Sequence, residues 1–187
     1  MDTLVIDIET KNSFEDVGGR DNLKDLKISV VGVYSYESGD YKAFEESELE
    51  DLGKMLQKTQ LIVTFAGKRF DLPVMEKYFN FNINAIKHFD ILEKIEEKYG
   101  RRIGLGILSE ANLGASKTGH GMEAIELYAR GEMEKLKSYC LNDVKLTKDI
   151  YDLIKKQKYL WIPQKNSSEM VKVEISPAEE SQQSQLI

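Results

Sequence analysis

Residues 4–10, Leu4-Val5-Ile6-Asp7-Ile8-Glu9-Thr10, begin as an apolar run and end with two carboxylates. The apolar part predicts a buried central strand. Side chains alternate along a strand, so Asp7 and Glu9 are expected on the same face, a few Å apart. Two like charges this close repel each other, and burial favours neither unless a cation neutralises them. The pair is therefore either the polar start of a loop or half of a metal site that needs carboxylates from elsewhere in the chain.

The rest of the chain predicts an α/β fold. From the apolar periodicity we expect strands at 27–36, 41–44, 61–65 and 86–90, and helices at 47–58, 71–79, 91–99, 104–112, 121–130 and 132–156. The polar residues 11–26 are expected to form a surface loop. We expect one domain over residues 1–162 and a polar, largely flexible tail over 163–187, in which only 170–175 resemble a strand.

Composition limits the class of protein. The 187 residues carry a net charge of −6, which argues against a generally basic nucleic-acid binder but not against an enzyme that holds phosphates through metal ions. The single cysteine, Cys140, excludes an intrachain disulfide and favours a reducing cytoplasm. No signal sequence and no apolar run of the roughly 18 residues of a membrane span is found. We therefore expect a cytoplasmic protein without a membrane partner.

Two further acids occupy unusual positions. Asp71 follows the predicted strand 61–65 near the start of a helix, and Asp143 lies in the middle of the apolar face of the helix at 132–156. If the first strand and strand 61–65 are parallel neighbours, Asp7, Glu9 and Asp71 meet at their carboxyl edge, where open α/β sheets bind ligands. Asp143 could complete the cluster. Oxygen ligands without His or Cys favour Mg²⁺ or Mn²⁺ over Zn²⁺.

Three segments carry a resemblance to a known family. Residues 5–10 (Val-Ile-Asp-Ile-Glu-Thr), 65–71 (Phe-Ala-Gly-Lys-Arg-Phe-Asp) and 139–143 (Tyr-Cys-Leu-Asn-Asp) resemble the three motifs of the DEDD (DnaQ-like) superfamily of 3′–5′ exonucleases. The Tyr-x-x-x-Asp spacing is similar to the DEDDy branch, because the DEDDh branch would need His where Ser138 stands. Residues 113–128, with the helix after them, resemble the YprB-like group. The resemblance spans roughly residues 3–155 and implies a ribonuclease H-like mixed five-stranded sheet flanked by helices.

The resemblance implies a function as well as a fold. It implies a metal-dependent 3′–5′ exonuclease that hydrolyses phosphodiester bonds at single-stranded 3′ ends, with DNA favoured, RNA possible and DNA repair among the open roles. Asp7, Glu9 and Asp143 would hold one divalent ion, Mg²⁺ or Mn²⁺, and Asp7 would bridge to a second that Asp71 helps to hold. Two such ions can clamp an in-line displacement. Tyr139 would orient the attacking water; by its position alone it could equally be a core aromatic residue.

Substrate contacts are expected around the second motif and in a glycine-rich segment. Basic side chains there could face phosphates, although solvated surface lysines are the commoner case. Where many relatives have Asn before the Gly, this chain has Ala66, which cannot donate an amide hydrogen bond. The substrate-binding candidates are Thr10, Ala66, Gly67, Lys68, Arg69, Lys117 and His120.

Two other classes stay open at this point. A catalytically weak or inactive nucleic-acid-binding or scaffold module is favoured by Ala66 and by the acidic composition. An endonuclease of ribonuclease H type shares a carboxylate cluster, but its acid pair is not expected on one strand as Asp7-x-Glu9. The C-terminal residues Gln183–Ile187 faintly resemble a peptide that docks a bacterial sliding clamp.

Overall fold

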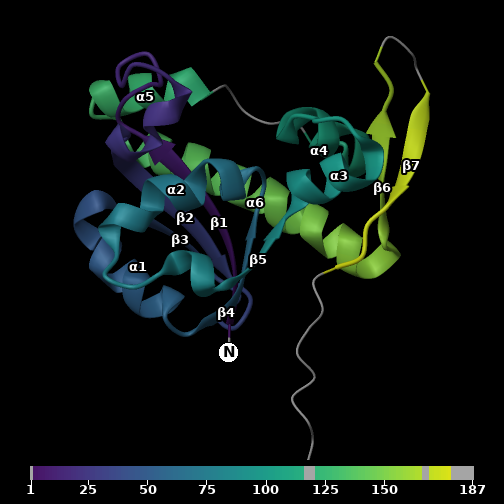
Figure 1. Ribbon diagram of the computed structural model, residues 1–187, viewed down its shortest axis with the longest axis horizontal. Coiled ribbons are helices and arrows are strands. Elements are labelled where there is room, and N and C mark those ends of the chain that lie inside the picture. Colours follow the sequence, from purple (N-terminus) through teal and green to yellow (C-terminus); the bar gives the residue numbers. More distant parts are fainter. Residues whose placement is uncertain (1, 116–120, 166–168, 178–187) are drawn as a thin grey trace, which may run out of the picture.

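A mixed five-stranded sheet forms the centre of the computed structural model, which describes residues 2–115, 121–165 and 169–177 (Figure 1). The strand order is β3-β2-β1-β4-β5. The strands are β1 (Asp2–Thr10), β2 (Ile28–Ser35), β3 (Tyr41–Glu45), β4 (Thr59–Thr64) and β5 (Lys87–Asp90). β1 pairs antiparallel with β2 and parallel with β4, and β4 pairs parallel with β5. The predicted α/β fold, with a mixed five-stranded sheet flanked by helices, is confirmed.

Six α-helices surround the sheet in the described part of the chain. They are α1 (Leu49–Leu56), α2 (Asp71–Met75), α3 (Ile91–Tyr99), α4 (Leu105–Leu113), α5 (Gly121–Ala129) and α6 (Met133–Gln157). α2 ends before the expected residue 79 and continues as a 3₁₀ turn at Glu76–Tyr78. The Tyr78 hydroxyl there accepts a hydrogen bond from the Ile28 amide at 3.0 Å, a tertiary contact that periodicity cannot reveal. Within the described ranges, no helix has both the length and the apolar character of a membrane span.

The segment at 11–26 is more ordered than a plain surface loop. It contains a 3₁₀ turn at Arg20–Asp25. The side chain of Leu26, which follows the turn, is only 1% exposed and belongs to the core on the α1 and α2 face of the sheet. An apolar residue at the end of a polar segment therefore anchors this connection to the domain.

The alternation along β1 divides the core into two halves. Leu4, Ile6 and Ile8 are buried in one cluster with apolar residues of α1 and α2. Val5 points to the opposite face, where it joins a cluster that includes residues of α3, α4 and α6. Because Asp7 and Glu9 have the same parity as Val5, the side chains of both acids belong to the α6 face.

A two-stranded ribbon beyond α6 was not expected as a whole. β6 (Tyr159–Pro163) pairs antiparallel with β7 (Met170–Glu174), and the ribbon stands at one side of the molecule (Figure 1). Leu160 and Ile162 are fully buried, and Ile175 is 1% exposed. The strand-like character of 170–175 is thus real, and the expectation of a loosely attached segment is wrong for these residues because burial against α3 and α4 holds them. Residues 166–168 and 178–187, including the clamp-like Gln183–Ile187, lie outside the described residues.

Candidate active site

Asp7 and Glu9 lie together near the carboxyl end of β1, against α6. Glu9 is 9% exposed and Asp7 is half-buried. One ligand atom from each of Asp7, Glu9 and Cys140 can be chosen so that all three lie within 4.8 Å of one another. The Cys140 thiol donates to the Asp7 carbonyl oxygen at 3.5 Å and lies 3.8 Å from its Oδ2. The predicted pairing of two carboxylates on one face of the strand is therefore present.

Asp71 joins these acids from the first residue of α2. Its side chain is 3% exposed, and its carboxylate accepts a hydrogen bond from the Ile8 amide of β1. Burial raises the pKa of Asp71 well above its usual range, and the negative charges of Asp7 and Asp90 raise it further. A carboxyl group whose ionisation is opposed in this way is stabilised by a cation beside it.

α6 supplies Asp143 and Tyr139, which lie one helical turn apart. They are 2% and 6% exposed. The pKa of Cys140, on the same helix, is raised first by burial and then by the charges of Asp7, Glu9 and Asp143. The thiol thus lies within electrostatic reach of acids from both β1 and α6. Among the described residues, the group whose ligand atoms all lie within 4.8 Å of one another consists of Asp7, Glu9 and Cys140. Asp71 lies within electrostatic reach of Asp7, and Asp143 lies within reach of Cys140.

Tyr139 also lies on the wall of an open hollow. The hollow is lined by residues of α5 and α6, namely Glu123, Leu127, Glu134, Lys135, Ser138, Tyr139 and Asn142. Tyr139 packs at the same time against the apolar cluster of Val30 and Leu136. Its ring is therefore part of the core, as the plainer interpretation required, while its position borders a space large enough for a ligand.

Gly32 is a site residue that the sequence analysis missed. It lies on β2 directly opposite Asp7. A Cβ at this position would lie 2.8 Å from Cγ2 of Val144 and 2.9 Å from the Sγ of Cys140, both on α6. The absence of a side chain lets α6 approach the sheet closely enough to bring Asp143 toward β1. A glycine inside a β-branched strand is the sequence signal that could have identified it.

Gly32→Ala is expected to lower the free energy of unfolding by about 1–3 kcal/mol, because the new methyl group overpacks the contact with α6. It is also expected to weaken binding of Mn²⁺, since α6 carries Asp143. Urea unfolding and calorimetric Mn²⁺ titration measure the two effects. Gly104→Ala is the matched control, because Gly104 has a φ of −78° and its added Cβ meets no atom within 4 Å. An Mn²⁺ affinity equal to that of the wild type would contradict the role of Gly32.

The loop before α2 is shaped around Asp71. A Cβ on Gly67 would overlap the Asp71 carboxylate and would lie 2.6 Å from the Thr64 side chain. Gly67, predicted as a substrate contact, therefore has a packing role at the acid cluster. Ala66 before it has a φ of 67°, in the left-handed region that costs a residue with a Cβ about 1 kcal/mol. Asn tolerates this conformation better than Ala, so the backbone of the loop is strained at Ala66.

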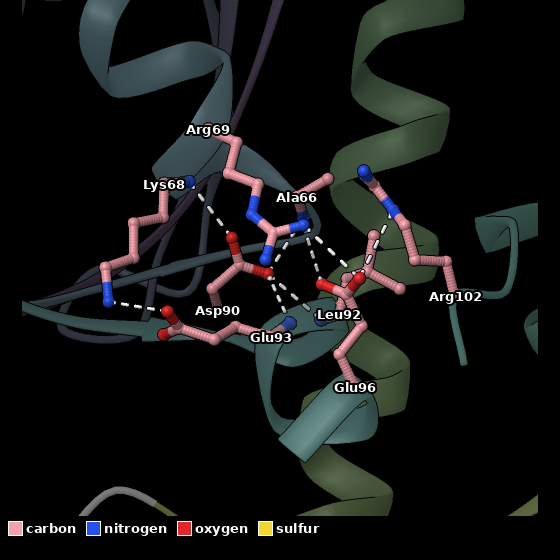
Figure 2. A pocket seen from close by; sticks show the side chains of 8 residues that line it. All are labelled: Ala66, Lys68, Arg69, Asp90, Leu92, Glu93, Glu96 and Arg102. Atoms are coloured by element: carbon pink, nitrogen blue, oxygen red, sulfur yellow. Dashed lines mark hydrogen bonds and ion pairs between the residues drawn. The ribbon is translucent and has the colours of Figure 1, made fainter. Parts of the chain in front are cut away.

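Asp90 fixes this strained loop (Figure 2). Its Oδ1 accepts the Ala66 amide at 2.9 Å, and its Oδ2 accepts the Lys68 amide at 3.0 Å. Oδ1 also accepts the amides of Leu92 and Glu93 at 3.0 and 3.2 Å, which caps α3. The helix cap could be expected from the sequence, but the bonds to the loop could not. One buried carboxylate thus ties the second motif to the start of α3.

The basic rim of the site is paired with glutamates of α3 (Figure 2). Lys68 Nζ lies 2.6 Å from Glu93 Oε1, and Arg69 Nη1 lies 2.9 Å from Glu96 Oε2. The side chains of Lys68 and Arg69 are 57% and 59% exposed, so solvent screens these pairs and a phosphate can compete for the cations. The structure places both side chains beside the loop that Asp90 holds.

Of the three remaining substrate-binding candidates, Thr10 lies within the described residues, and Lys117 and His120 do not. The Thr10 hydroxyl at the end of β1 donates to the Asn12 carbonyl at 2.9 Å, and its side chain is buried.

The donor set fits a hard divalent cation. Asp7 and Glu9 of β1 offer carboxylate oxygens within 4.8 Å of each other, and burial together with the charges of Asp7 and Asp90 opposes the ionisation of Asp71 on α2. Oxygen-rich sites of this kind suit Mg²⁺ and Mn²⁺. The neighbouring Cys140 is held as a neutral thiol, because burial and the three acids raise its pKa.

Solved structures share this fold over most of the chain. The family B DNA polymerase of Pyrobaculum calidifontis matches with a TM-score of 0.63 and 16% identity, over 82% of this chain and 24% of that one. The RNase D of Trypanosoma brucei matches with a TM-score of 0.56 and 16% identity, over 80% of this chain and 56% of that one. E. coli Exonuclease I in complex with a dA16 oligonucleotide matches with a TM-score of 0.52 and 16% identity, over 84% of this chain and 41% of that one. The chain thus spans about a quarter to about half of each of these proteins, and at such identity the likeness shows the fold alone.

Sequence comparisons give one further result. A search of curated proteins finds no match. The family model of the RNase_H superfamily matches residues 4–155, which include most of β1, all of β2 to β5 and nearly all of α6. This match spans well over half of the chain and contains all four acids, and the chain belongs to the RNase_H superfamily.

Proposed function

We propose that the protein is a metal-dependent 3′–5′ exonuclease of the DEDDy type that acts on single-stranded nucleic acid. The observation that carries the proposal is the close pair of Asp7 and Glu9 on β1, with Asp71 near enough that burial and then the charge of Asp7 raise its pKa, and with Asp143 on the facing helix within reach of Cys140. Carboxylates that are buried close together repel one another, and a bound cation offsets this repulsion. The fold shared with an RNase D and with Exonuclease I bound to an oligonucleotide supports the same class of reaction.

Under this proposal the acids would bind the metal ions and Tyr139 would position the water. Asp7, Glu9 and Asp143 would hold one divalent ion, and Asp7 with Asp71 a second. When bound, the ions supply a water nucleophile at neutral pH and stabilise the charge on the leaving oxygen. Tyr139 would hold the attacking water through its hydroxyl, because a phenol with a pKa near 10 is a poor base at neutral pH.

The surroundings suggest how a strand end would reach the acids. The hollow beside Tyr139 opens between α5 and α6, and its wall includes Ser138 and Asn142. On the other side of the cluster, Lys68 and Arg69 could bind phosphates in exchange for Glu93 and Glu96. A terminal nucleotide in the hollow would place its phosphodiester next to the acids.

The test is the fate of a 5′-labelled single-stranded oligonucleotide with a free 3′-hydroxyl. With Mg²⁺ or Mn²⁺, the product is expected to shorten one nucleotide at a time, and Asp7→Asn and Asp143→Asn are expected to abolish the shortening. Asp149→Asn is the matched control, because Asp149 lies on α6 outside the cluster and pairs with Lys145 at 2.6 Å. Activity that survives in both cluster variants would overturn the mechanism, and cleavage of a circular strand would indicate an endonuclease.

Matched DNA and RNA oligonucleotides in the same assay decide the substrate. RNA differs from DNA by its 2′-hydroxyl, so a preference would require the hollow beside Tyr139 to bind or exclude this group. We expect DNA to be shortened faster.

A nucleic-acid-binding module without turnover is the second candidate. Ala66, which lacks an amide donor, and the ion pairs that neutralise Lys68 and Arg69 are the observations in its favour. Under that alternative the wild type would bind oligonucleotides and would leave them intact with Mn²⁺. The same labelled strand, followed by fluorescence polarisation and by gel, separates the two functions.

A further inference from the structure

The outer face of the β6–β7 ribbon carries an exposed tryptophan and a half-buried tyrosine beside a lysine. The ring centroids of Tyr159 and Trp161 lie 5.8 Å apart at 82°, and Trp161 is 39% exposed. The Lys172 ammonium lies 4.3 Å from the Tyr159 ring centroid. Leu160 and Ile162 on the inner face are fully buried and hold the ribbon on the domain. The ribbon is thus held by its inner face, and the ring of Trp161 on its outer face can contact a ligand.

The backbone under this face is fixed by side chains of the domain. The Asn112 side chain of α4 donates to the Trp161 carbonyl and accepts from the Trp161 amide, both at 2.8 Å. Arg101 Nη2 donates to the Pro163 carbonyl at 2.8 Å. A ring presented on a fixed backbone loses little conformational entropy when a ligand binds, which favours affinity.

The charge of the segment indicates the kind of ligand. The ribbon itself, residues 159–174, has two lysines and two glutamates, but the exposed Lys156 and Lys158 directly precede β6 and add positive charge beside Tyr159, although the whole chain has a net charge of −6. A local positive excess next to an exposed ring matches a polyanion with planar groups. Single-stranded nucleic acid has both properties, since its bases stack on aromatic side chains and its phosphates attract lysines.

The ribbon lies next to the helix that borders the candidate active site. α3 begins at the cap formed by Asp90, pairs with Lys68 and Arg69 through its glutamates, and packs against β7. Just beyond the end of α3, Arg101 binds the ribbon. The family match ends at residue 155, before β6 begins, so the ribbon is a feature of this chain outside the matched fold.

We propose that the outer face of the ribbon, formed by Tyr159, Trp161 and Lys172, is a stacking platform for the single strand whose 3′ end enters the candidate active site. This inference rests on the proposed function, which identifies the ligand as nucleic acid. One base stacks on Trp161, and Lys172 contacts a neighbouring phosphate. The platform lengthens the contact with the strand beyond the terminal nucleotide.

The test uses the only tryptophan of the chain as its own reporter. The full chain, in EDTA so that no cleavage occurs, is titrated with oligothymidylate while tryptophan emission is recorded. We expect quenching that weakens as salt increases, and no quenching with a blunt duplex. By polarisation of a labelled strand, Trp161→Ala is expected to raise Kd about 5- to 100-fold, the range that stacking of a single base provides, whereas Trp161→Phe retains most of the affinity.

Tyr41→Ala is the matched control. Tyr41 is also 39% exposed but lies on β3, at the opposite edge of the sheet from β5. Its substitution is expected to leave Kd unchanged. Thermal unfolding of each variant shows whether the fold is intact, because the main-chain bonds of Trp161 to Asn112 do not depend on the ring.

The possible outcomes separate this inference from the proposed function. If the wild type shortens oligonucleotides with Mn²⁺ and Trp161→Ala binds them with unchanged Kd, the platform is wrong and the exonuclease stands. If the wild type neither binds nor shortens oligonucleotides, the platform and the proposed exonuclease function are both overturned. If Trp161→Ala binds normally but abolishes a dimer seen by sedimentation, the face is a surface for a second copy of the chain and the platform is again overturned.

Discussion

Asp71→Asn is expected to make the metal-free protein more stable and to lower its metal-dependent cleavage by about a thousandfold. The amide keeps an oxygen that can accept the Ile8 hydrogen bond but removes the buried charge that Asp7 opposes. We expect a gain of about 1–2 kcal/mol in the free energy of unfolding at neutral pH without metal. Loss of a carboxylate that would hold the second metal ion, and with it the positive charge that stabilises the transition state, accounts for the fall in activity.

The pH dependence gives the sign of this effect. Because the pKa of Asp71 is raised in the native state, the native state holds its proton after the unfolded state has released it. Stability of the metal-free wild type should therefore fall as pH rises above about 4, the ordinary Asp value, and Asp71→Asn should lack this component. Urea unfolding of both proteins in EDTA across this range measures the difference.

Added Mn²⁺ and a control on the same strand complete the experiment. Mn²⁺ should stabilise the wild type by mass action, and it should stabilise Asp71→Asn less, because this variant keeps Asp7, Glu9 and Asp143 but loses a ligand of the second ion. Asp2→Asn is the control, because Asp2 lies at the other end of β1 and accepts hydrogen bonds from the Ser35 hydroxyl and the Glu37 amide. Its substitution should lower stability and leave the response to Mn²⁺ intact. A metal-free Asp71→Asn protein that is less stable than the wild type at every pH would contradict the charge argument.

Asp90→Ala is expected to have the largest effect on stability, a loss of about 3 kcal/mol or more. It leaves four backbone amides without their charged acceptor, on the loop at 66–68 and at the start of α3. The left-handed Ala66 loses the bond that holds it, so the loop that positions Asp71 should relax. Chemical denaturation measures the stability, and Mn²⁺ titration measures the effect on the site.

Asp90→Asn separates the cap from the loop. Oδ1 accepts the amides of Ala66, Leu92 and Glu93, whereas Oδ2 accepts only that of Lys68. An Asn whose oxygen takes the place of Oδ1 keeps the hydrogen bonds from Ala66, Leu92 and Glu93. Its NH₂ group then faces the Lys68 amide, and two donors cannot bond each other. We therefore expect a loss of stability between that of Asp90→Ala and zero. Asn82→Ala, which removes a cap with a single backbone bond at 3.0 Å, should cost about 1 kcal/mol and leave Mn²⁺ binding unchanged. Equal stability of Asp90→Ala and the wild type would contradict the role of Asp90.

The sequence by itself determined the acids and the main elements around them. Alternation along residues 4–10 placed Asp7 and Glu9 on one face, and strand pairing in the sheet agrees with it. Asp143 was found because it lies in the middle of an apolar helix face, and Asp71 because it lies at the junction of a predicted strand and a helix. These inferences depend on the geometry of single elements, which a few neighbouring residues fix. The ribbon was missed although Tyr159 to Ile162 alternate between outer and buried positions, because strand β6 depends on a partner strand whose paired residues lie seven to fifteen positions away.

Only the tertiary structure decided how closely the acids approach and what surrounds them. The role of Gly32 depends on the approach of α6, more than a hundred residues along the chain. The bonds from Asp90 to the loop and the pairing of Lys68 with Glu93 join elements that local patterns treat separately. Packing between distant segments sets these distances, and no local periodicity encodes them. The sequence thus predicted the four acids and placed Asp7 and Glu9 side by side near the end of β1, and the packing of α6 and α3 determined what surrounds that pair.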